Sequence, residues 1–324
     1  MMDRPNTRWE ILRNLKKSET FLSGEELAKP LGVSRISVWK HIQNLKKMGY
    51  EIESKRGEGY KLLEPPDKLL PPEILPLDTE IVGREIIHYE EVKSTNLKMR
   101  EKSEEEEGLI ILAERQTEGK GRLGRNWKSP KGGIWMSVLL KPNIPPVETP
   151  LLTMISSTSV FESLQEIGIE GSIKWPNDVL VDGEKICGIL TEMDAEMGAL
   201  NYVIIGIGLN VNFDKNELPD TGATTVQSIL EEKVDRKALT GSIITNLDKW
   251  YRKLKKNSKE EILDSWRANS HNLGRKVDVE MVTGESFTGT AVDFTDTGGL
   301  VVKGENGSER TFLSGDVTLS SDSR

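Results

Sequence analysis

The apolar positions of the first 66 residues follow a helical spacing before they change to the spacing of short strands. One helix is predicted from the apolar face that Ile11 and Leu15 mark. A second helix begins at Ser23, because Glu26 three residues later completes a capping box. This helix ends near residues 30–32, where a proline and a glycine stand.

A third helix follows directly after this turn. Ser34 caps it, and its apolar face is formed by Val38, Ile42 and Leu45 at positions i, i+4 and i+7. Two helices joined by a tight turn that contains glycine are typical of a helix-turn-helix domain. The second of the two helices would then face DNA.

Two strand-like stretches, residues 50–54 and 60–63, come next and are joined by a basic turn with two glycines. Such a hairpin predicts a wing that contacts phosphates. A small three-helix packing or dimerisation domain remains the alternative. The candidate DNA-binding residues of the reading helix and the wing are Ser34, Arg35, Ser37, Trp39, Lys40, His41, Lys55 and Arg56.

Residues 75–270 alternate between strand-like and helix-like patterns. Asp182-Gly183 between two of the strands is a strong two-residue hairpin signal. Antiparallel pairing within such a run favours an α+β domain with a mixed sheet over a doubly wound one. The expected strands are 85–89, 109–113, 133–140, 172–175, 179–181, 185–193 and 202–207, with helices at 95–102, 151–167 and within 226–273.

The last fifty residues or so, 276–320, are short β runs separated by glycines. This spacing predicts a small β-barrel. A Pro-rich stretch at residues 64–72 breaks regular structure and marks a linker after the first domain.

Charge is unevenly distributed along the 324 residues, whose net charge is −8. The first 66 residues hold 13 Lys and Arg against 9 Asp and Glu, and the rest holds 31 against 43. A weakly basic head on an acidic body suits local DNA contacts rather than indiscriminate nucleic-acid binding. Cys187 is the single cysteine, so no internal disulfide forms. Without an apolar run long enough for a bilayer or a signal peptide, we expect a cytoplasmic protein.

The most informative segment is the glycine-rich loop 116–127. Its Gly119-x-Gly121-x-x-Gly124 spacing matches the dinucleotide fingerprint, but no apolar helix follows, and the P-loop pattern is absent as well. Lys120, Arg122 and Arg125 add three cations to it. Glycines let backbone N–H groups approach a ligand, and arginines pair with phosphate or carboxylate oxygens. The loop therefore predicts an anionic ligand.

A second segment, Lys174-Trp175-Pro176-Asn177-Asp178, ends a strand and enters the predicted hairpin. A lysine at this position presents a fixed positive charge. Asp178 is a candidate carboxylate for Mg²⁺, which is usually held by one or two carboxylates and substrate phosphates. A third segment, residues 206–212, has small residues and amides that suit a ligand wall.

These motifs, in this order and after Ser94-Thr95-Asn96, resemble those of the biotin protein ligases that also serve as biotin-operon repressors. The resemblance covers essentially the whole chain. It implies a winged helix-turn-helix domain at 1–66, a catalytic domain similar to class II synthetases at 67–272 and an SH3-like barrel at 273–324. The loop departs from the family pattern at Lys120 and Leu123, where arginines are most frequent.

The resemblance also implies the substrates biotin and ATP, Mg²⁺, a biotin carboxyl-carrier domain as acceptor, operator DNA and a homodimer. The catalytic cations would be Arg122, Lys174 and Arg125. Biotin would be bound by Ser94, Thr95, Asn96, Gln116, Gly119, Lys120, Gly121, Arg122, Lys174 and Gly188, and ATP or the adenylate by Arg122, Arg125, Trp127, Asn177 and Asn210.

Three alternatives remain open at this point. The enzyme could attach lipoate or another small acid through the same adenylate chemistry, although the 116–127 loop favours biotin. The protein could sense biotin without turnover, which Arg122 and Lys174 argue against. Finally, its N-terminal domain could have lost repressor function.

Overall fold

The computed structural model describes residues 7–218, 222–281 and 283–320. The chain divides into two compact units, Met1–Lys68 and Leu69–Arg324. Each unit has its own buried apolar core. No helix within the described ranges has the length and apolar character needed to cross a membrane.

The first unit confirms the predicted helices and hairpin. Its described part consists of α1 (Thr7–Lys17), α2 (Gly24–Leu31), α3 (Arg35–Lys47), β1 (Glu51–Lys55) and β2 (Gly59–Glu64). Ser23 and Glu26 form the capping box of α2, and Gly32 ends that helix in the left-handed conformation at φ 65°. Leu15, Val38 and Ile42 are fully buried, so the apolar faces read from the sequence meet in one core.

The second unit is built on a mixed sheet, as predicted. Its described strands pair in the order β3-β4-β5-β9-β8-β7-β6. Only β3 and β4 are parallel among the pairings of these described strands. The strands are β3 (Ile86–Tyr89), β4 (Ile110–Ala113), β5 (Ile134–Leu140), β6 (Ser172–Lys174), β7 (Asp178–Val181), β8 (Glu184–Glu196) and β9 (Ala199–Leu209).

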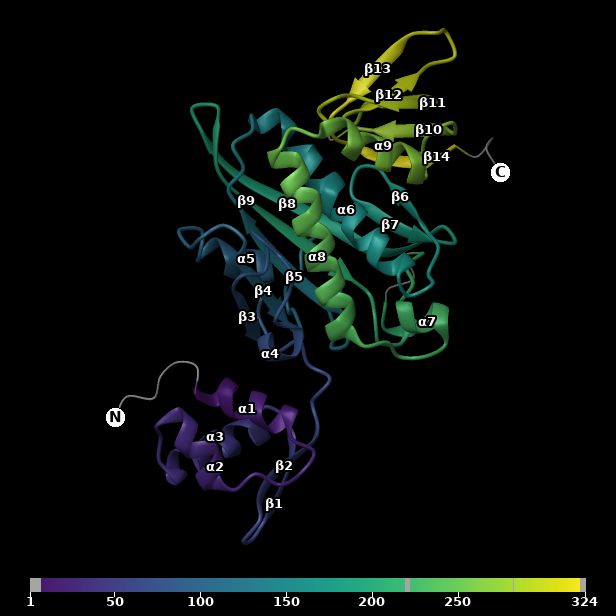
Figure 1. The fold of residues 1–324 in the computed structure, drawn as a ribbon. Coiled ribbons are helices and arrows are strands. Elements are labelled where there is room, and N and C mark those ends of the chain that lie inside the picture. Colours follow the sequence, from purple (N-terminus) through teal and green to yellow (C-terminus); the bar gives the residue numbers. More distant parts are fainter. Residues whose placement is uncertain (1–6, 219–221, 282, 321–324) are drawn as a thin grey trace. The chain divides into compact units, whose positions relative to one another are not determined.

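Helices cover both faces of this sheet (Figure 1). The long helices α6 (Thr149–Gln165) and α8 (Arg236–Lys255) pack together on one face. The short α5 (Thr95–Arg100) packs on the other face, where Met99 joins a separate apolar cluster with Ile111 and Ile204. The remaining described helices are α4 (Pro71–Ile74), α7 (Val226–Leu230) and α9 (Lys259–Asn269).

The hairpin of β8 and β9 is longer than the sequence pattern indicated. We expected strands at 185–193 and 202–207, whereas the pairing continues to Glu196 and Ala199 around a Met197-Gly198 turn. This outer part is exposed on most of its residues. Met197 at its tip is apolar but fully exposed, so this part has little of the buried apolar face from which strands are read in a sequence.

The C-terminal strands form an antiparallel sheet in the order β13-β12-β11-β10-β14 among the described residues. The last strand pairs back to the first, which is the return expected of a small barrel-like domain. Its core is continuous with that of the seven-stranded sheet and its helices, since Trp266 of α9 contacts Phe294 edge to face at 5.5 Å. The strands are β10 (Lys276–Glu280), β11 (Ser286–Phe294), β12 (Leu300–Lys303), β13 (Glu309–Phe312) and β14 (Asp316–Leu319).

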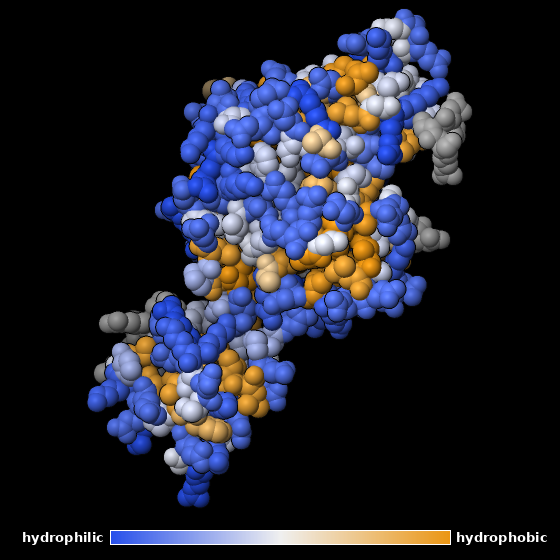
Figure 2. Space-filling view, turned by 45° about the vertical axis from the view of Figure 1, so that its right-hand side comes forward, coloured by the Kyte–Doolittle hydropathy of each residue, from blue (hydrophilic) through white to orange (hydrophobic). Residues whose placement is uncertain are grey.

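The surfaces of both units are mostly hydrophilic, in keeping with the charged composition of the chain. Figure 2 shows hydrophilic residues over much of the face in view, with hydrophobic residues gathered in patches on each unit. On the first unit, Ile36 and Trp39 of α3 are 69% and 52% exposed. These two apolar side chains stand beside Arg35 and Lys40 on the helix predicted to read DNA.

Candidate active site

A cavity of about 770 Å³ opens in the second unit where the glycine-rich loop, the β6–β7 turn, β8, β9 and β14 meet. Its volume suits a small-molecule ligand with a nucleotide. The cavity collects nearly all of the residues that the sequence singled out in the catalytic part. Those that line it are Ser94, Thr95, Asn96, Gln116, Lys120, Gly121, Arg122, Arg125, Trp127, Lys174, Asn177, Asp178, Gly188 and Asn210.

Gly119 is the one predicted ligand-binding residue of this part that is absent from the lining of the described cavity. It is buried behind the loop, and a Cβ added there would lie 2.4 Å from the Trp127 carbonyl oxygen. The Gly119 carbonyl accepts a hydrogen bond from Trp127 N–H at 2.8 Å. Glycine at this position thus lets the loop fold back on itself.

One end of the cavity is polar and well bonded. Gln116 Oε1 accepts a hydrogen bond from the Thr95 backbone N–H at 2.8 Å, and Gln116 Nε2 donates to Ser129 Oγ at 2.9 Å. Behind Thr95, Ser137 Oγ lies 2.8 Å from Thr95 Oγ1 and 2.6 Å from Asn96 Oδ1. Ser137 is fully buried on β5 and was missed from the sequence, although it is the polar residue in an otherwise apolar strand.

The arginines of the loop lie against the C-terminal sheet. Arg122 donates to the Gly315 carbonyl at 3.2 Å and to Asn177 Oδ1 at 3.3 Å. Arg125 forms an ion pair with Asp316, and Arg122 Nη1 lies 3.9 Å from that carboxylate. Burial lowers the pKa of Arg122, while the charges of Asp316 and of a second aspartate raise it. Arginine stays protonated in proteins, so a fixed positive charge remains at the cavity.

Trp127 forms an aromatic wall of the cavity. A Cβ at Gly208 would lie 2.5 Å from Trp127 Nε1, and one at Gly188 would lie 3.1 Å from the ring. The two glycines of β9 and β8 therefore make room for the indole. The Nζ atom of Lys185 lies 5.0 Å from the centre of the ring, a cation–π distance.

The base of the loop is held by a buried ion pair. Arg236 Nη2 lies 2.9 Å from Glu114 Oε2, and Arg236 Nη1 donates to the Gly133 carbonyl at 2.9 Å. Glu114 also contacts His88 Nε2 at 3.0 Å. Burial alone would raise the pKa of Glu114, but the His88 contact and the Arg236 charge outweigh it and lower the pKa to about 2. Both ends of the segment 115–132 are thereby fixed.

Comparisons with known proteins agree with this site. The Biotin/lipoate A/B protein ligase family model matches residues 89–210, an HTH domain model residues 8–61, and the Biotin protein ligase C terminal domain model residues 273–320. The Bifunctional ligase/repressor BirA of Bacillus subtilis (strain 168) is 38% identical over 92% of this chain and 94% of its own. This chain belongs to the biotin protein ligase family.

Two further relatives place the chain within this family. The Bifunctional ligase/repressor BirA of Escherichia coli (strain K12) is 28% identical over 93% of this chain and 94% of its own. The structure of the biotin protein ligase from Aquifex aeolicus in complex with biotin and ATP has a TM-score of 0.62 at 31% identity, over 73% of this chain and 99% of that one. The resemblance to bifunctional ligase/repressors inferred from the motifs is confirmed.

Lys185 is a cation at the cavity that sequence reasoning missed. It lies on β8 at the cavity, and its Nζ is 2.6 Å from Asp178 Oδ1. The sequence did carry part of the signal, because a two-residue turn at Asp182-Gly183 pairs Lys185 with Leu180. The pairing shifts at a bulge between Val179 and Leu180, and no residue pattern in the sequence predicts this bulge.

Lys174 also lies at the cavity, on β6. No ion pair or side-chain hydrogen bond is recorded for it among the described residues. Its charge contributes, after burial and Arg275, to lowering the pKa of the nearby His271. The cavity therefore receives lysines from β6 and β8, the two strands that flank β7, and Lys185 is held by contacts on two sides.

Asn177 and Asn210, the two amides predicted to bind the nucleotide, differ in which side-chain atoms remain available to a ligand. Asn177 Nδ2 donates to the Ile189 carbonyl at 2.7 Å, and its Oδ1 accepts from Arg122, so Asn177 holds the arginine in place. Asn210 Nδ2 donates to the Thr224 carbonyl at 3.0 Å. Its Oδ1 is buried and has no recorded partner among the described residues, so it can accept from a ligand.

Asp178 fits a metal only in combination with substrate. Its carboxylate pairs with Lys185, and no group of three or more potential ligands is found in the described residues. Mg²⁺ commonly takes one or two carboxylates and completes its shell with phosphates and water. The donor set thus fits an ion delivered with the nucleotide rather than a resident metal.

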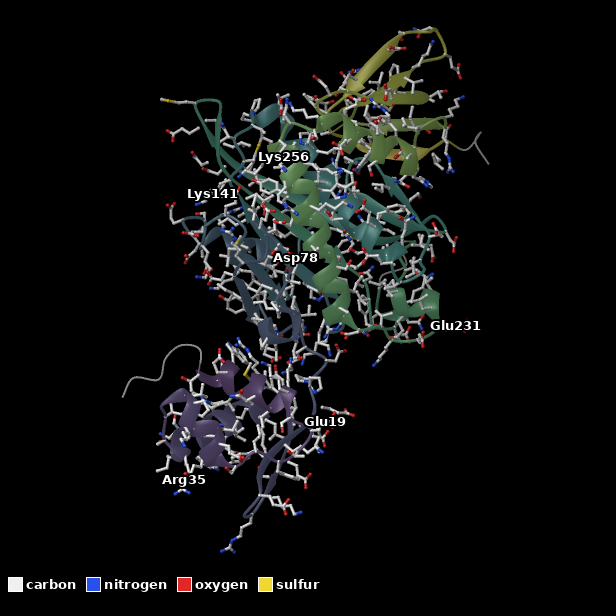
Figure 3. The ribbon with its side chains drawn as sticks, in the orientation of Figure 1. Glu19, Arg35, Asp78, Lys141, Glu231 and Lys256 are labelled. Atoms are coloured by element: carbon white, nitrogen blue, oxygen red, sulfur yellow. The ribbon has the colours of Figure 1, made fainter. Side chains whose placement is uncertain are left out.

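The predicted DNA-binding residues lie on α3, at its cap and in the β1–β2 hairpin of the first unit. Ser34 Oγ accepts from the Ser37 backbone N–H at 3.1 Å, so the serine caps the helix. Arg35 points outward from its unit in Figure 3. Trp39, Lys40, Lys55 and Arg56 are exposed, while Ser37 and His41 are half-buried.

Proposed function

We propose that this protein activates biotin as biotinyl-AMP and transfers it to a lysine of a biotin carboxyl-carrier domain. The observation that carries the proposal is one cavity with hydrogen-bond acceptors at one end and an aromatic ring with cations at the other. The Bacillus subtilis relative, named a bifunctional ligase/repressor, supports it over nearly the whole length. We also propose that the activity is cytoplasmic, because the first half-reaction consumes ATP.

The first half-reaction needs charge rather than a base. A carboxylate with a pKa near 4–5 is ionised at neutral pH and can attack the α-phosphate of ATP directly. Repulsion between the anions and charge on the phosphoryl oxygens oppose the step, and fixed cations relieve both. Arg122, Arg125, Lys174 and Lys185 supply them. Mg²⁺ bound with the nucleotide would neutralise the departing pyrophosphate, with Asp178 as the available carboxylate.

The other predicted residues bind and shield the substrates. Ser94, Thr95, Gln116 and the backbone of Lys120 and Gly121 contact biotin, with Gly119 supporting the loop from behind. Trp127 stacks on the adenine, and Asn210 Oδ1 accepts a hydrogen bond from the adenylate. A closed loop over the mixed anhydride protects it from water until an acceptor lysine arrives.

The direct test is a transfer assay with the full chain, biotin, ATP, Mg²⁺ and a biotin carboxyl-carrier domain. We expect biotin on the acceptor, measured by mass spectrometry. An acceptor whose target lysine is replaced by arginine is the matched control and should stay unmodified. Lipoate in place of biotin tests the allied ligase reading. Transfer of lipoate at a rate equal to that of biotin, or no transfer of biotin, would refute the proposal.

The N-terminal unit acts as a repressor that responds to the adenylate. One winged helix contacts few bases, whereas a two-fold dimer reads two half-sites, so operator affinity should require a homodimer. Ligand that orders loops in one copy lowers the entropy loss of joining a second, which couples adenylate to dimerisation. The acidic second unit makes binding without this coupling weak.

This regulatory part is tested by DNA affinity with and without biotin and ATP, on a palindromic site upstream of biotin genes. We expect tighter binding with both ligands and a steep fall with salt. Arg35→Ala and Lys40→Ala should weaken binding. Lys256→Ala, which removes an exposed charge of the second unit (Figure 3), is the control and should have no effect. Equal affinity with and without the adenylate would remove the repressor role and leave the ligase.

A further inference from the structure

The transfer half-reaction needs a proton acceptor that the cations of the cavity do not supply. A lysine side chain has a reference pKa near 10.4 and attacks only as the uncharged amine. After the attack its nitrogen carries a positive charge and must lose a further proton before the amide is formed. The lysines and arginines that line the cavity are themselves protonated at neutral pH, so they cannot take this proton.

Three side chains of the described cavity lining can accept a proton at neutral pH, namely Asp178, Asp316 and His271. The two carboxylates are already engaged by cations. Asp178 Oδ1 lies 2.6 Å from Lys185 Nζ, and Asp316 forms an ion pair with Arg125. No ion pair is recorded for His271 within the described residues, so its ring is the proton acceptor that remains available.

His271 lies in the connection between α9 and β10, directly beside β6. Ser270 forms a parallel bridge with Ile173, and the His271 backbone N–H donates to the Ile173 carbonyl at 2.8 Å. Side chains alternate along a strand, so Ser172 and Lys174 share one face of β6 while Ile173 is buried on the other. His271 Nδ1 lies 3.1 Å from Ser172 Oγ. The imidazole therefore belongs to the face from which Lys174 reaches the cavity.

The contact with Ser172 orients the imidazole of His271 and leaves its other nitrogen for the substrate. A serine hydroxyl can accept a hydrogen bond from Nδ1–H, which makes Nε2 the basic nitrogen of the ring. Burial lowers the pKa of His271 below its ordinary value, and the positive charges of Arg275 and Lys174 lower it further. The ring is therefore uncharged at neutral pH and ready to accept a proton.

We propose that His271 is the base of the transfer step, and that its Nε2 takes a proton from the acceptor lysine as this lysine attacks biotinyl-AMP. The inference rests on the proposed ligase function and adds a catalytic residue to its second half-reaction. The lysine ammonium first loses one proton to water, and the amine then attacks the carbonyl carbon. The C–N bond forms, the C–O bond to the phosphate breaks, and AMP leaves with the electron pair. The second proton passes from the nitrogen to His271 Nε2 and from there to water.

The test supplies biotinyl-AMP directly, so that transfer is measured apart from adenylate formation. The full chain, in excess over biotinyl-AMP, is mixed with the carrier domain or with hydroxylamine, and the reaction without protein is subtracted. For His271→Ala we expect transfer to lysine to slow about 10²-fold, within the usual range for a general base. Hydroxylamine is uncharged at neutral pH and its nitrogen is far less basic, so water takes its proton and its reaction should be unchanged. Pyrophosphate release from biotin and ATP should also be unchanged.

Two further measurements separate proton transfer from packing. His271→Gln retains a polar side chain but cannot take a proton, so it should transfer as slowly as His271→Ala. Imidazole added to His271→Ala should restore part of the rate to lysine and none to hydroxylamine. Ser172→Ala leaves the imidazole in place without its hydrogen bond and should slow transfer by a smaller factor.

The pH profile gives a readout that a structural role of His271 would not change. Below saturation, the logarithm of the wild-type transfer rate should rise with a slope of about two below the pKa of His271 and about one above it, because both the amine and the histidine must lose a proton. For His271→Ala the slope should be about one throughout. Arg275→Gln removes a charge that lowers the pKa of His271, so the change of slope should move to higher pH. Lys256→Ala, which removes an exposed charge elsewhere, is the control and should not move it.

The outcomes separate this inference from the function on which it rests. A folded His271→Ala chain that transfers biotin to lysine at the wild-type rate would overturn it. Equal losses with lysine and with hydroxylamine would also overturn it, since His271 would then position the adenylate rather than take a proton. Failure of the wild type to form biotinyl-AMP or to biotinylate the carrier domain would instead refute the ligase function.

Discussion

The two ends of the cavity satisfy their polar groups in different ways. At the Thr95 end, hydrogen bonds to neutral neighbours and to Glu192 of β8 fix each group. At the Arg122 end, Arg125 is paired with Asp316, Lys185 with Asp178, and Arg122 with a backbone carbonyl. The first end is complete before ligand arrives, while the second holds carboxylates near the positions where phosphate oxygens would bind.

This difference has a chemical reason. A ureido ring is neutral and is recognised by the geometry of donors and acceptors, which must be prepared in advance because buried polar groups without partners are unfavourable. An adenylate brings its own negative charge, so its cations can be paired with internal carboxylates until it binds. Specificity for the acid thus belongs to the rigid end, and retention of the intermediate belongs to the exchangeable end.

The largest effect is expected from Lys185→Ala. Oxyanion-type donors commonly contribute about 3–4 kcal/mol each, so adenylate formation should fall about 10²- to 10³-fold. Lys174→Ala should lower the rate of adenylate formation by a smaller factor. Contacts to Asp178 and Trp127 hold Lys185 in place, whereas no such contact is recorded for the Lys174 side chain among the described residues. Pyrophosphate release measures both, and Lys256→Ala is the control. Near-normal release by Lys185→Ala would contradict its role.

Arg122→Gly should mainly affect retention. In the proposed function this arginine pairs with the phosphoryl group, so its loss should free biotinyl-AMP about tenfold or more faster, while formation slows less. Charge-assisted hydrogen bonds are about twice as strong as neutral ones. Released adenylate acylates lysines of bystander proteins, which biotin-specific blotting detects. Arg125→Gly should release less adenylate than Arg122→Gly, because the Arg125 side chain is 66% exposed. Strict acceptor specificity in Arg122→Gly would exclude this role.

Two glycines of β9 allow each end to be disturbed separately. Gly206→Ala places a methyl 2.5 Å from Asn96 Oδ1, and Gly208→Ala places one 2.5 Å from Trp127 Nε1. We expect Gly206→Ala to weaken biotin binding about tenfold with ATP affinity intact, and Gly208→Ala to do the reverse, because small displacements of positioning groups have large effects. The two variants control for each other. Equal loss of both ligands in either variant would show that the ends are not independent.

The sequence predicted the fold and one side of the site better than the other. The glycine loop and the Lys174–Asp178 segment are continuous stretches, so their residue types can be read in order. Ser137, Lys185 and Asp316 were missed because their meaning depends on pairing register and on elements distant in sequence. Ser137 lies in a fully buried strand, and Asp316 reaches the loop from the last described strand of the C-terminal sheet.

The smallest effect is expected from Asp316→Asn, which removes the charge that pairs with Arg125 and lies near Arg122 in the ligand-free protein. Exposed ion pairs contribute about 0–1 kcal/mol, so the loop should open only a few-fold more often. Trypsin cleavage after Arg122 and Arg125, followed by mass spectrometry, measures this opening. Asp293→Asn breaks an exposed pair with Arg267 away from the cavity and is the matched control.

The same variant tests whether Asp316 and the phosphoryl group of the adenylate occupy the arginines in turn. When biotin and ATP form the adenylate, its negative charge takes over both arginines, and the cleavage rates of Asp316→Asn and the wild type should converge. In the ligand-free state the rates should differ. A difference that persists unchanged with the adenylate bound would mean that Asp316 holds the loop in every state, and the contrast between a prepared end and an exchangeable end would not hold.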